Sequence, residues 1–218
     1  GPFAARMDAR IGRAASLIAR AQTIAGQEPE TRDAESPADD LFADALRDTT
    51  GAEMAFLPGL GYGVAIPPGE ITAEQLRNLI PHDSAVWTMR LSGRQVRDVL
   101  EQAVENFSAQ DSTKKVGGMI QVSGLRFTYD PARPRGGRIL SVSVGGRPIE
   151  PDRSYSVATN ALLAEGGHNY RAFTEGADRR RVEGTDQYAM VRAWIQRRGT
   201  IAAPPLDRIT KVSDSAPR

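Results

Sequence analysis

The chain has 218 residues, 40% of them apolar and 25% charged, with 28 Lys and Arg against 27 Asp and Glu. The formal charge of +1 gives no electrostatic excess favouring nucleic acid or an anionic membrane surface, and the absence of cysteine excludes disulfide scaffolds, thiolate metal sites and thiol nucleophiles. At roughly 150 residues per domain, we expect one domain with an N-terminal extension.

The N-terminal segment begins Gly-Pro-Phe ahead of the first methionine, Met7, which is typical of a cleaved affinity tag. Apolar residues then recur at helical spacing (Ile11, Ala14, Ala15, Ile18, Ala21), and this predicts an amphipathic helix over residues 7–25. We therefore expect residues 1–25 to be a tag remnant and linker helix, 26–212 to form the domain, and 213–218 to be a disordered tail. No apolar run approaches the roughly 20 residues of a membrane-spanning helix.

Residues 27–53 are rich in acids, which predicts a solvent-exposed acidic face. The nine acids are Glu28, Glu30, Asp33, Glu35, Asp39, Asp40, Asp44, Asp48 and Glu53. Within this stretch, Ser36 and Pro37 are typical of an N-cap and a first helical position, so a helix is expected to end near Thr50.

Two capping boxes mark the next helices, at Thr72–Gln75 and Ser92–Gln95, with an alternating strand over 85–91 between them. A buried strand at 52–57 precedes them. From residue 119 the pattern changes to period two, predicting strands over 119–129, 139–144, 147–149 and 155–159. A last helix from Thr185 ends at Gly199. The fold class is therefore α+β, a mixed β-sheet packed with helices.

Two glycine-containing loops are candidate ligand sites. Gly59, Gly61 and Gly63 follow a strand, but Pro67 and Pro68 prevent the helix that a dinucleotide fingerprint requires. This loop either lets a ligand approach the backbone or is a plain tight turn. The loop over residues 164–170 either contacts a ligand or is a wide turn whose polar side chains bond locally.

The chain has only two histidines, His82 and His168, too few for a dinuclear phosphoesterase centre, which needs several. We assign no catalytic residue and no metal ligand to this chain. A Ser-His-Asp triad is disfavoured because no Gly-x-Ser-x-Gly elbow is present. The run Arg179–Arg181 is either an anion-gripping cluster or, as is usual for so short a run, solvated surface.

Five segments follow one another in a specific order: Leu-Phe-Ala-Asp-Ala at 41–45, Ile-Thr-Ala-Glu-Gln-Leu at 71–76 with Ile-Pro at 80–81, Leu-Ser-Gly at 91–93, the glycine-rich 116–125, and Tyr-Ser-Val-Ala-Thr-Asn at 155–160 with Gly166 and Gly167. In this order they resemble the C-terminal domain of the 5′-nucleotidase family. The resemblance implies a domain that binds and orients substrate, joined by a linker helix to an N-terminal metallophosphoesterase domain.

In that family the two divalent metal ions, Mn or Zn, would lie in the N-terminal domain, which is absent from these residues. The resemblance thus implies the recognition part of a phosphoester or sulfur-ester hydrolase, inactive as this isolated chain and exported to the periplasm or cell surface of a bacterium. Its implied partners are that N-terminal domain and a small ester substrate or a carrier protein, with no nucleic acid and no membrane span. The alternative is a non-catalytic, degenerate nucleotidase-like module that docks a protein or small ligand.

The chain also departs from the nucleotidase pattern. Gly63 stands where nucleotidases have a phosphate-holding arginine, His82 and Leu162 where they have two adenine-stacking phenylalanines, and His168 where they have an aspartate. The spacing of Phe56, Pro58, Gly59 and Gly63 resembles the thiosulfohydrolase branch, in which a sulfonate is hydrolysed from a carrier protein's cysteine. The expected substrate-binding residues are Gly59, Gly61, Tyr62, His82, Asn160, Gly166, Gly167, His168, Asn169 and Tyr170.

Overall fold

The computed structural model describes residues 7–19, 35–59, 65–108 and 116–212 of the chain. The helices are α2 (Pro37–Thr50), α3 (Ala73–Leu79), α4 (Gly93–Ser108), α5 (Ala161–Ala164) and α6 (Gln187–Arg198), with 3₁₀ turns η3 (Gly167–Asn169) and η4 (Arg171–Phe173). The strands are β1 (Arg10–Ala14), β2 (Ile18–Ala19), β3 (Met54–Leu57), β4 (Ala65–Ile66), β5 (Gly69–Thr72), β6 (Val86–Ser92), β7 (Gln121–Ser123), β8 (Leu125–Tyr129), β9 (Ile139–Val144), β10 (Arg147–Pro148), β11 (Ser154–Asn160), β12 (Ala177–Arg181), β13 (Thr200–Ile201) and β14 (Ile209–Lys211).

The central element is a five-stranded mixed sheet with the order β12-β6-β11-β3-β7. Strands β3 and β11 pair in parallel, and the other neighbours are antiparallel. Smaller sheets have the orders β10-β9-β8-β14, β13-β1-β5 and β2-β4. This arrangement confirms the predicted α+β class with mixed sheets.

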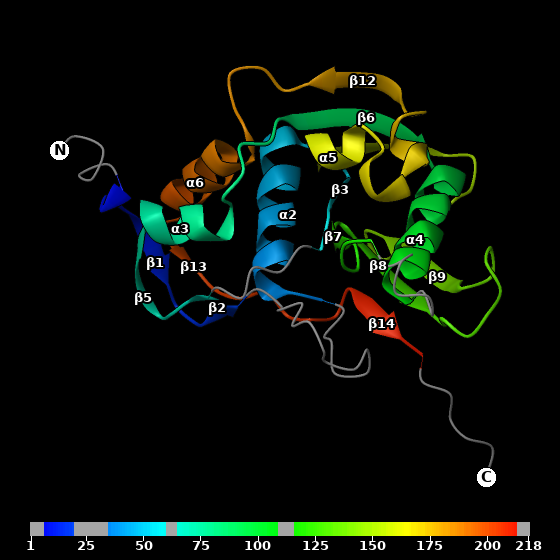
Figure 1. The fold of residues 1–218 in the computed structure, drawn as a ribbon, viewed down its shortest axis with the longest axis horizontal. Helices are drawn as coiled ribbons and strands as arrows, with labels where there is room; N and C mark the ends of the chain where they lie inside the picture. The colour runs from blue at the N-terminus through cyan, green and yellow to red at the C-terminus, as the bar shows by residue number, and fades with distance from the viewer. Residues whose placement is uncertain (1–6, 20–34, 60–64, 109–115, 213–218) are drawn as a thin grey trace, which may run out of the picture.

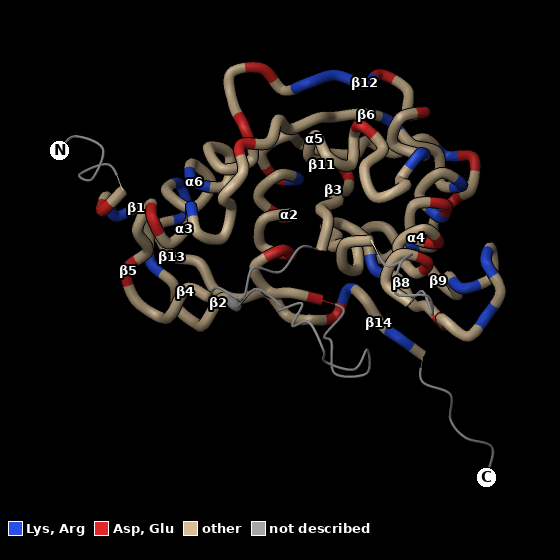
Figure 2. The backbone as a smooth tube through the Cα atoms, in the orientation of Figure 1, with Lys and Arg blue, Asp and Glu red and all other residues tan. Residues whose placement is uncertain are grey.

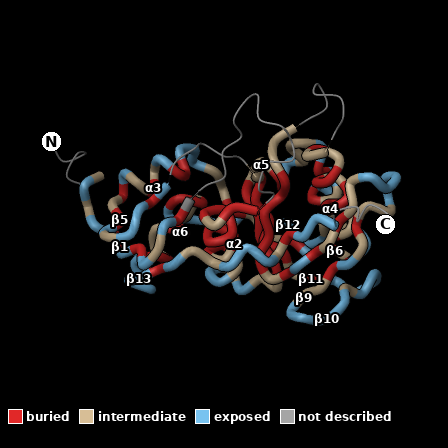
Figure 3. The backbone as a smooth tube through the Cα atoms, turned by 90° about the horizontal axis from the view of Figure 1, so that it is seen from below, coloured by how far each residue is buried: buried red, intermediate tan, exposed pale blue. Residues whose placement is uncertain are grey.

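The five-stranded sheet separates two apolar cores. Helices α2, α3 and α6 cover one face, and α4 with the β8–β9 sheet lies toward the other (Figure 1). Side chains alternate along β3, so that Ala55 and Leu57 belong to the first core while Met54 and Phe56 belong to the second. Many of the most buried residues therefore lie in the middle of the molecule, in β11 and α2 (Figure 3).

Local sequence signals placed the helix ends correctly. The Ser36 hydroxyl accepts from the Asp39 amide at the start of α2, and the Thr72 and Gln75 groups bond reciprocally at the start of α3. The same reciprocal pair links Ser92 to Gln95. Helix α6 ends at a glycine with φ of 69°, as predicted.

The predicted helix over residues 7–25 is wrong for the residues that the structure describes. Strand β1 pairs in parallel with β13 and antiparallel with β5. Gly12, in the middle of β1, lies against α6, where an added Cβ would be 2.6 Å from Ile195 Cγ2. Glycine disfavours helix interiors, and the pairing partners lie far away in the sequence, so the helical spacing was misleading. Residues 20–25 lie outside the described residues, and β1 packs as part of the domain rather than as a separate linker.

The prediction of an exposed acidic face is also wrong in part, because Glu35, Asp39 and Asp40 are buried. Arg208 lies beside two of them: its Nε is 3.5 Å from Asp40 Oδ2, and its backbone N–H donates to Glu35 Oε1 at 3.0 Å. Its guanidinium also donates to both oxygens of the half-buried Asp44 at 2.9 Å. Because Arg208 lies 164 positions from Asp44 in the sequence, no local sequence pattern predicts this pairing. Glu28, Glu30, Asp33 and the predicted tail 213–218 lie outside the described residues.

Candidate substrate-recognition site

A cavity of about 260 Å³ lies where four segments of the first core converge. It is lined by the end of β3 (Leu57, Pro58), the loop after α3 (Leu79 to Ser84), the β11–α5 junction (Asn160, Leu162) and the start of α6 (Gln187). Strands β3 and β11 run in parallel, so their carboxyl ends open at the same edge of the sheet. Such edges are the usual place for ligands, because backbone pairing has ended there and the loops are positioned by a rigid scaffold.

Asn160 holds this junction together. Its side-chain oxygen accepts from the Leu163 amide at 3.3 Å, which caps α5, and its Nδ2 donates to Gln187 Oε1 at 3.3 Å. Gln187 is itself fixed, since its backbone N–H donates to Ser84 O at 2.8 Å. Asn160 is thus both a wall of the cavity and a structural bridge between β11 and α6.

His82 and Leu162 form the more accessible walls. His82 is exposed, on the loop between α3 and β6, and Leu162 is half-buried in the first turn of α5. The structure brings these two residues, predicted from separate segments, to one cavity together with Asn160. An imidazole and a branched aliphatic group offer one polar tip and one apolar surface, but no pair of flat aromatic faces.

The loop over residues 166–169 lies directly behind Leu162. An added Cβ on Gly167 would be 2.6 Å from Leu162 O, so only glycine permits this close packing. His168 and Asn169 both adopt left-handed backbone conformations, with φ of 53° and 66°. Asn106 on α4 supports the loop by donating from Nδ2 to His168 O at 2.8 Å. Strained conformations of this kind persist only where surrounding contacts hold them.

The His168 ring packs over Gly117, where an added Cβ would be 2.7 Å from Nδ1. Burial lowers the pKa of this imidazole below its ordinary 6.5. At neutral pH His168 is therefore a neutral hydrogen-bonding group rather than a cation. It does not line the cavity that contains His82.

The remaining predicted residues separate. Tyr170 is buried in the second core, edge-on to Phe173 with ring centroids 6.1 Å apart, so it is not a wall of the His82 cavity. Asn169 is exposed beside it, on a larger hollow of about 770 Å³ along α4. Gly166 adopts φ of 80° and precedes η3. The sequence therefore grouped residues of two different surfaces into one loop site.

Gly59 has a packing role. An added Cβ there would lie 2.0 Å from Met119 O, and one on Gly118 would lie 1.9 Å from Gly59 O. The backbones at Gly59 and at Gly118 pass so close to each other that neither position has room for a side chain. Gly61 and Tyr62 lie outside the described residues.

Sequence reasoning missed Gln187, because a buried glutamine one residue after a helix N-cap has no local signature; only its bond to Asn160, 27 positions away, reveals its place. Within the ranges that the structure describes, no three His, Asp or Glu side chains are grouped so that they could hold a metal ion. Nor is any of the described helices long and apolar enough to cross a membrane.

The family described as 5′-nucleotidase, C-terminal domain, matches residues 11–175 of the chain. The chain belongs to this family. The match begins in β1, which agrees with the placement of that strand inside the domain.

Curated relatives of the domain include the trifunctional nucleotide phosphoesterase YfkN of Bacillus subtilis, 29% identical over 161 residues, which cover 70% of this chain and 11% of that protein. The NAD 5′-nucleotidase of Haemophilus influenzae is 28% identical over 135 residues, covering 59% of this chain and 22% of that protein. The chain thus spans well under a third of these relatives.

Two solved structures share the fold. A 5′-nucleotidase precursor from Thermus thermophilus superposes with a TM-score of 0.80 at 25% identity, covering 98% of this chain and 41% of that one. A sulfate thiohydrolase from the same organism gives the same TM-score at 24% identity, covering 100% of this chain and 38% of that one. The fold is therefore equally similar to both.

Proposed function

We propose that this domain is the substrate-recognition part of a two-domain, metal-dependent hydrolase, with two divalent ions, Mn or Zn, held by a phosphoesterase domain outside this chain. The family match over residues 11–175 carries the proposal. The domain's coverage of about two fifths of a 5′-nucleotidase precursor supports it. No hydrolytic step is assigned to the residues of this chain; their part is to bind the substrate and orient it.

The cavity that contains His82 is the proposed recognition site. Leu162 supplies an apolar contact, His82 a polar tip near solvent, and Asn160 a fixed amide at the end of β11. Gly167 packs directly behind Leu162, and the left-handed turn of His168 and Asn169 follows it. We expect the parent protein to work in the periplasm or at the cell surface of a bacterium.

The substrate class follows from the walls of the cavity. Stacking on an aromatic ring contributes roughly 0.5–1.5 kcal/mol beyond burial, and His82 with Leu162 does not offer the two-ring clamp that nucleobases occupy in nucleotidases. We therefore propose a compact phosphate or sulfur ester, including a sulfonate carried on the cysteine of a partner protein, as in the thiosulfohydrolase branch.

The test compares the complete parent polypeptide with this chain, each with Mn²⁺ or Zn²⁺. Three substrates are offered: 5′-AMP, phenyl phosphate and a cysteine S-sulfonate peptide. The parent protein should hydrolyse at least one of the two compact esters faster than 5′-AMP, and this chain alone should hydrolyse none. Metal-dependent turnover by this chain, or a parent protein that prefers 5′-AMP, would overturn the proposal.

Variants of the parent protein locate the site. His82→Phe with Leu162→Phe should lower the KM for 5′-AMP, because a second aromatic surface becomes available, while Arg147→Gln, on the exposed strand β10, should leave it unchanged. His168→Ala should raise KM or slow turnover by releasing the turn behind Leu162. A parent protein without a metal-binding segment would instead support the non-catalytic docking module.

A further inference from the structure

A third hollow, of about 450 Å³, lies between the end of α2, strands β6 and β12, and the first turns of α6, and it shares no lining residue with the cavity that contains His82. Its polar lining residues are four threonines with Arg180 and Arg181, and the Arg180 guanidinium lies against one of these threonines, Thr88. No Asp or Glu lines it among the described residues. The hollow therefore presents hydrogen-bond donors without a built-in negative charge.

Strand β12 carries the basic charge to this place. All five of its residues are exposed, and its arginine run appears as a continuous basic stretch along one edge of the molecule (Figure 2). A register shift between Ala177 and Arg180, where Asp178 has φ of 52°, sets Arg180 opposite Thr88 of β6. Bulges commonly re-aim a side chain, and this one fixes which arginine reaches the hollow.

The three arginines of the run have different partners. Arg179 donates to Ala164 O at 2.7 Å and lies over the Trp87 ring, so its role is structural. Arg180 donates from Nε to Thr88 Oγ1 at 3.2 Å, and within the part of the chain that the structure describes neither Arg180 nor Arg181 forms an ion pair. The Arg180 guanidinium is thus held beside the hollow by a neutral partner, and its charge remains available to an anion.

Two carbonyls near the end of α2 already accept hydrogen bonds within the protein: Leu46 O accepts from the Thr50 hydroxyl at 2.7 Å, and Arg47 O accepts from the Gly51 amide at 3.0 Å. Arg197 of α6 adds a further guanidinium, which donates to Thr49 Oγ1 at 3.2 Å. The opposite wall is apolar, formed by Val182, Met190 and two alanines of α6.

We propose that this hollow is a binding site for an organic oxyanion, a molecule with a terminal phosphate, sulfonate or carboxylate and an apolar body. Arg180 binds the charged oxygens through charge-assisted hydrogen bonds. The hydroxyls of Thr88 and Thr49 accept from arginines, so each keeps a hydrogen that it can donate to the same oxygens. The apolar body lies on Val182 and Met190. The volume is within the range of small-molecule sites.

The experiment uses the 218-residue chain and phenyl phosphate, with inorganic phosphate as the probe that lacks an apolar body. In titrations followed by the methyl resonances of the methionines, phenyl phosphate should shift Met190 saturably and leave Met54, which lies in the other core, unmoved. Inorganic phosphate should bind at least tenfold more weakly. Shifts confined to other methionines, or no saturation, would overturn the proposal.

Variants then test the charge. Arg180→Gln should weaken phenyl phosphate binding by about tenfold, the loss expected for one charge-assisted hydrogen bond, whereas Arg147→Gln, an equal change of charge in a different sheet, should have no effect. Equal weakening by both variants would indicate a diffuse electrostatic effect and would refute the site. The His82→Phe variant should bind phenyl phosphate at the Met190 site unchanged, so failure here is distinguishable from failure of the proposed function.

Discussion

Replacing Arg208 by methionine should strongly destabilise the domain, because this arginine neutralises a buried group of carboxyls. Its side chain is 13% exposed, with Asp40 at 0% and Asp44 at 25%. The guanidinium donates to both Asp44 oxygens and to Val122 O, each at 2.9 Å, and its Nε lies 3.5 Å from Asp40 Oδ2. Methionine keeps the aliphatic packing while removing every one of these donors.

Removing one partner of a buried ion pair costs about 3–5 kcal/mol. The partial exposure of Asp44 places the expected loss near 3 kcal/mol, since solvent screens that carboxylate in part. At roughly 2–4 °C per kcal/mol for a chain of this size, Tm should fall by about 6–12 °C.

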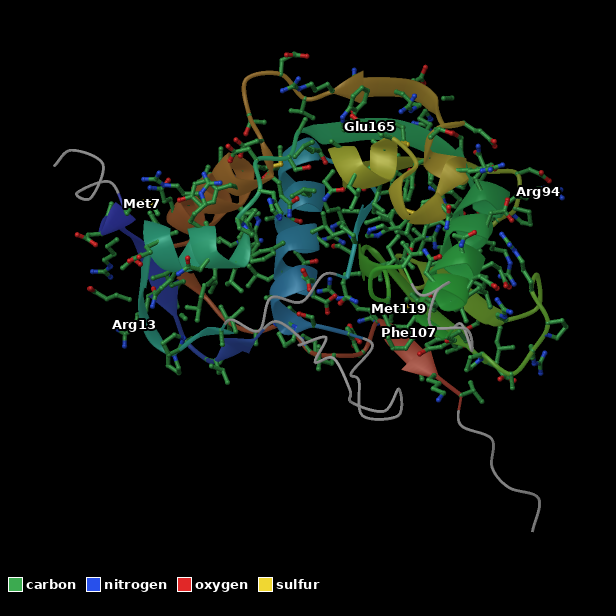
Figure 4. The ribbon with its side chains drawn as sticks, in the orientation of Figure 1. Met7, Arg13, Arg94, Phe107, Met119 and Glu165 are labelled. Atoms are coloured by element: carbon green, nitrogen blue, oxygen red, sulfur yellow. The ribbon has the colours of Figure 1, made fainter. Side chains whose placement is uncertain are left out.

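Thermal unfolding followed by circular dichroism measures the change. The matched control is Arg94→Met, which removes the Arg94–Asp152 pair at the outer end of α4, with side chains 69% and 82% exposed (Figure 4). The control should leave Tm unchanged. A fall of less than about 2 °C for Arg208→Met, or equal falls for both variants, would show that the buried group does not depend on this charge.

Three other outcomes follow from the same structure. Burial raises the pKa of Asp40 to about 10, so the folded state keeps a proton that the unfolded state loses above the ordinary pKa of 3.8. The free energy of unfolding should therefore fall as pH rises from 5 to 9. The urea midpoint of Asp40→Asn should fall less over this range, and equal falls for both proteins would contradict the argument. Gly118→Ala should lower the free energy of unfolding by more than about 2 kcal/mol, since the new Cβ would lie 1.9 Å from Gly59 O. Gly137→Ala, whose Cβ would make an ordinary contact at 3.6 Å, should leave it nearly unchanged in the same urea titration. In an NMR titration the His168 ring should show a pKa below 6.5, and a value above it would contradict the burial argument.

Features encoded within a few residues could be predicted from the sequence. The capping boxes at Thr72 and Ser92 satisfy orphan amides with side chains three positions away, and the glycine at 199 ends α6 where no other residue adopts its conformation easily. Period-two alternation likewise located β9 and β11. Each of these signals is local, so no knowledge of the tertiary fold was needed.

Features that depend on distant partners could not be predicted. Strand β1 becomes a strand because β5 and β13 flank it, although its own spacing also fits a helix. Asp40 and Asp44 of α2 are paired with Arg208, which reaches them from the far end of the chain. In the candidate site, His82 and Asn160 were predicted separately and share a cavity, whereas Gln187 was missed and Tyr170 belongs to the core. A residue type and its spacing identify a loop but not which surface the loop lines.

The position of the proposed recognition cavity allows its walls to change while the fold stays the same. Strands β3 and β11 send alternate side chains into both cores, so the edge where they end is held from two sides. Asn160 connects β11 to α5 and α6 through its two side-chain hydrogen bonds, so its replacement would disturb both helices. His82 is exposed and Leu162 only half-buried, so the scaffold tolerates different side chains at both positions. Under the function proposed above, specificity is set at these two walls, where an aromatic clamp and its absence would separate one substrate class from another.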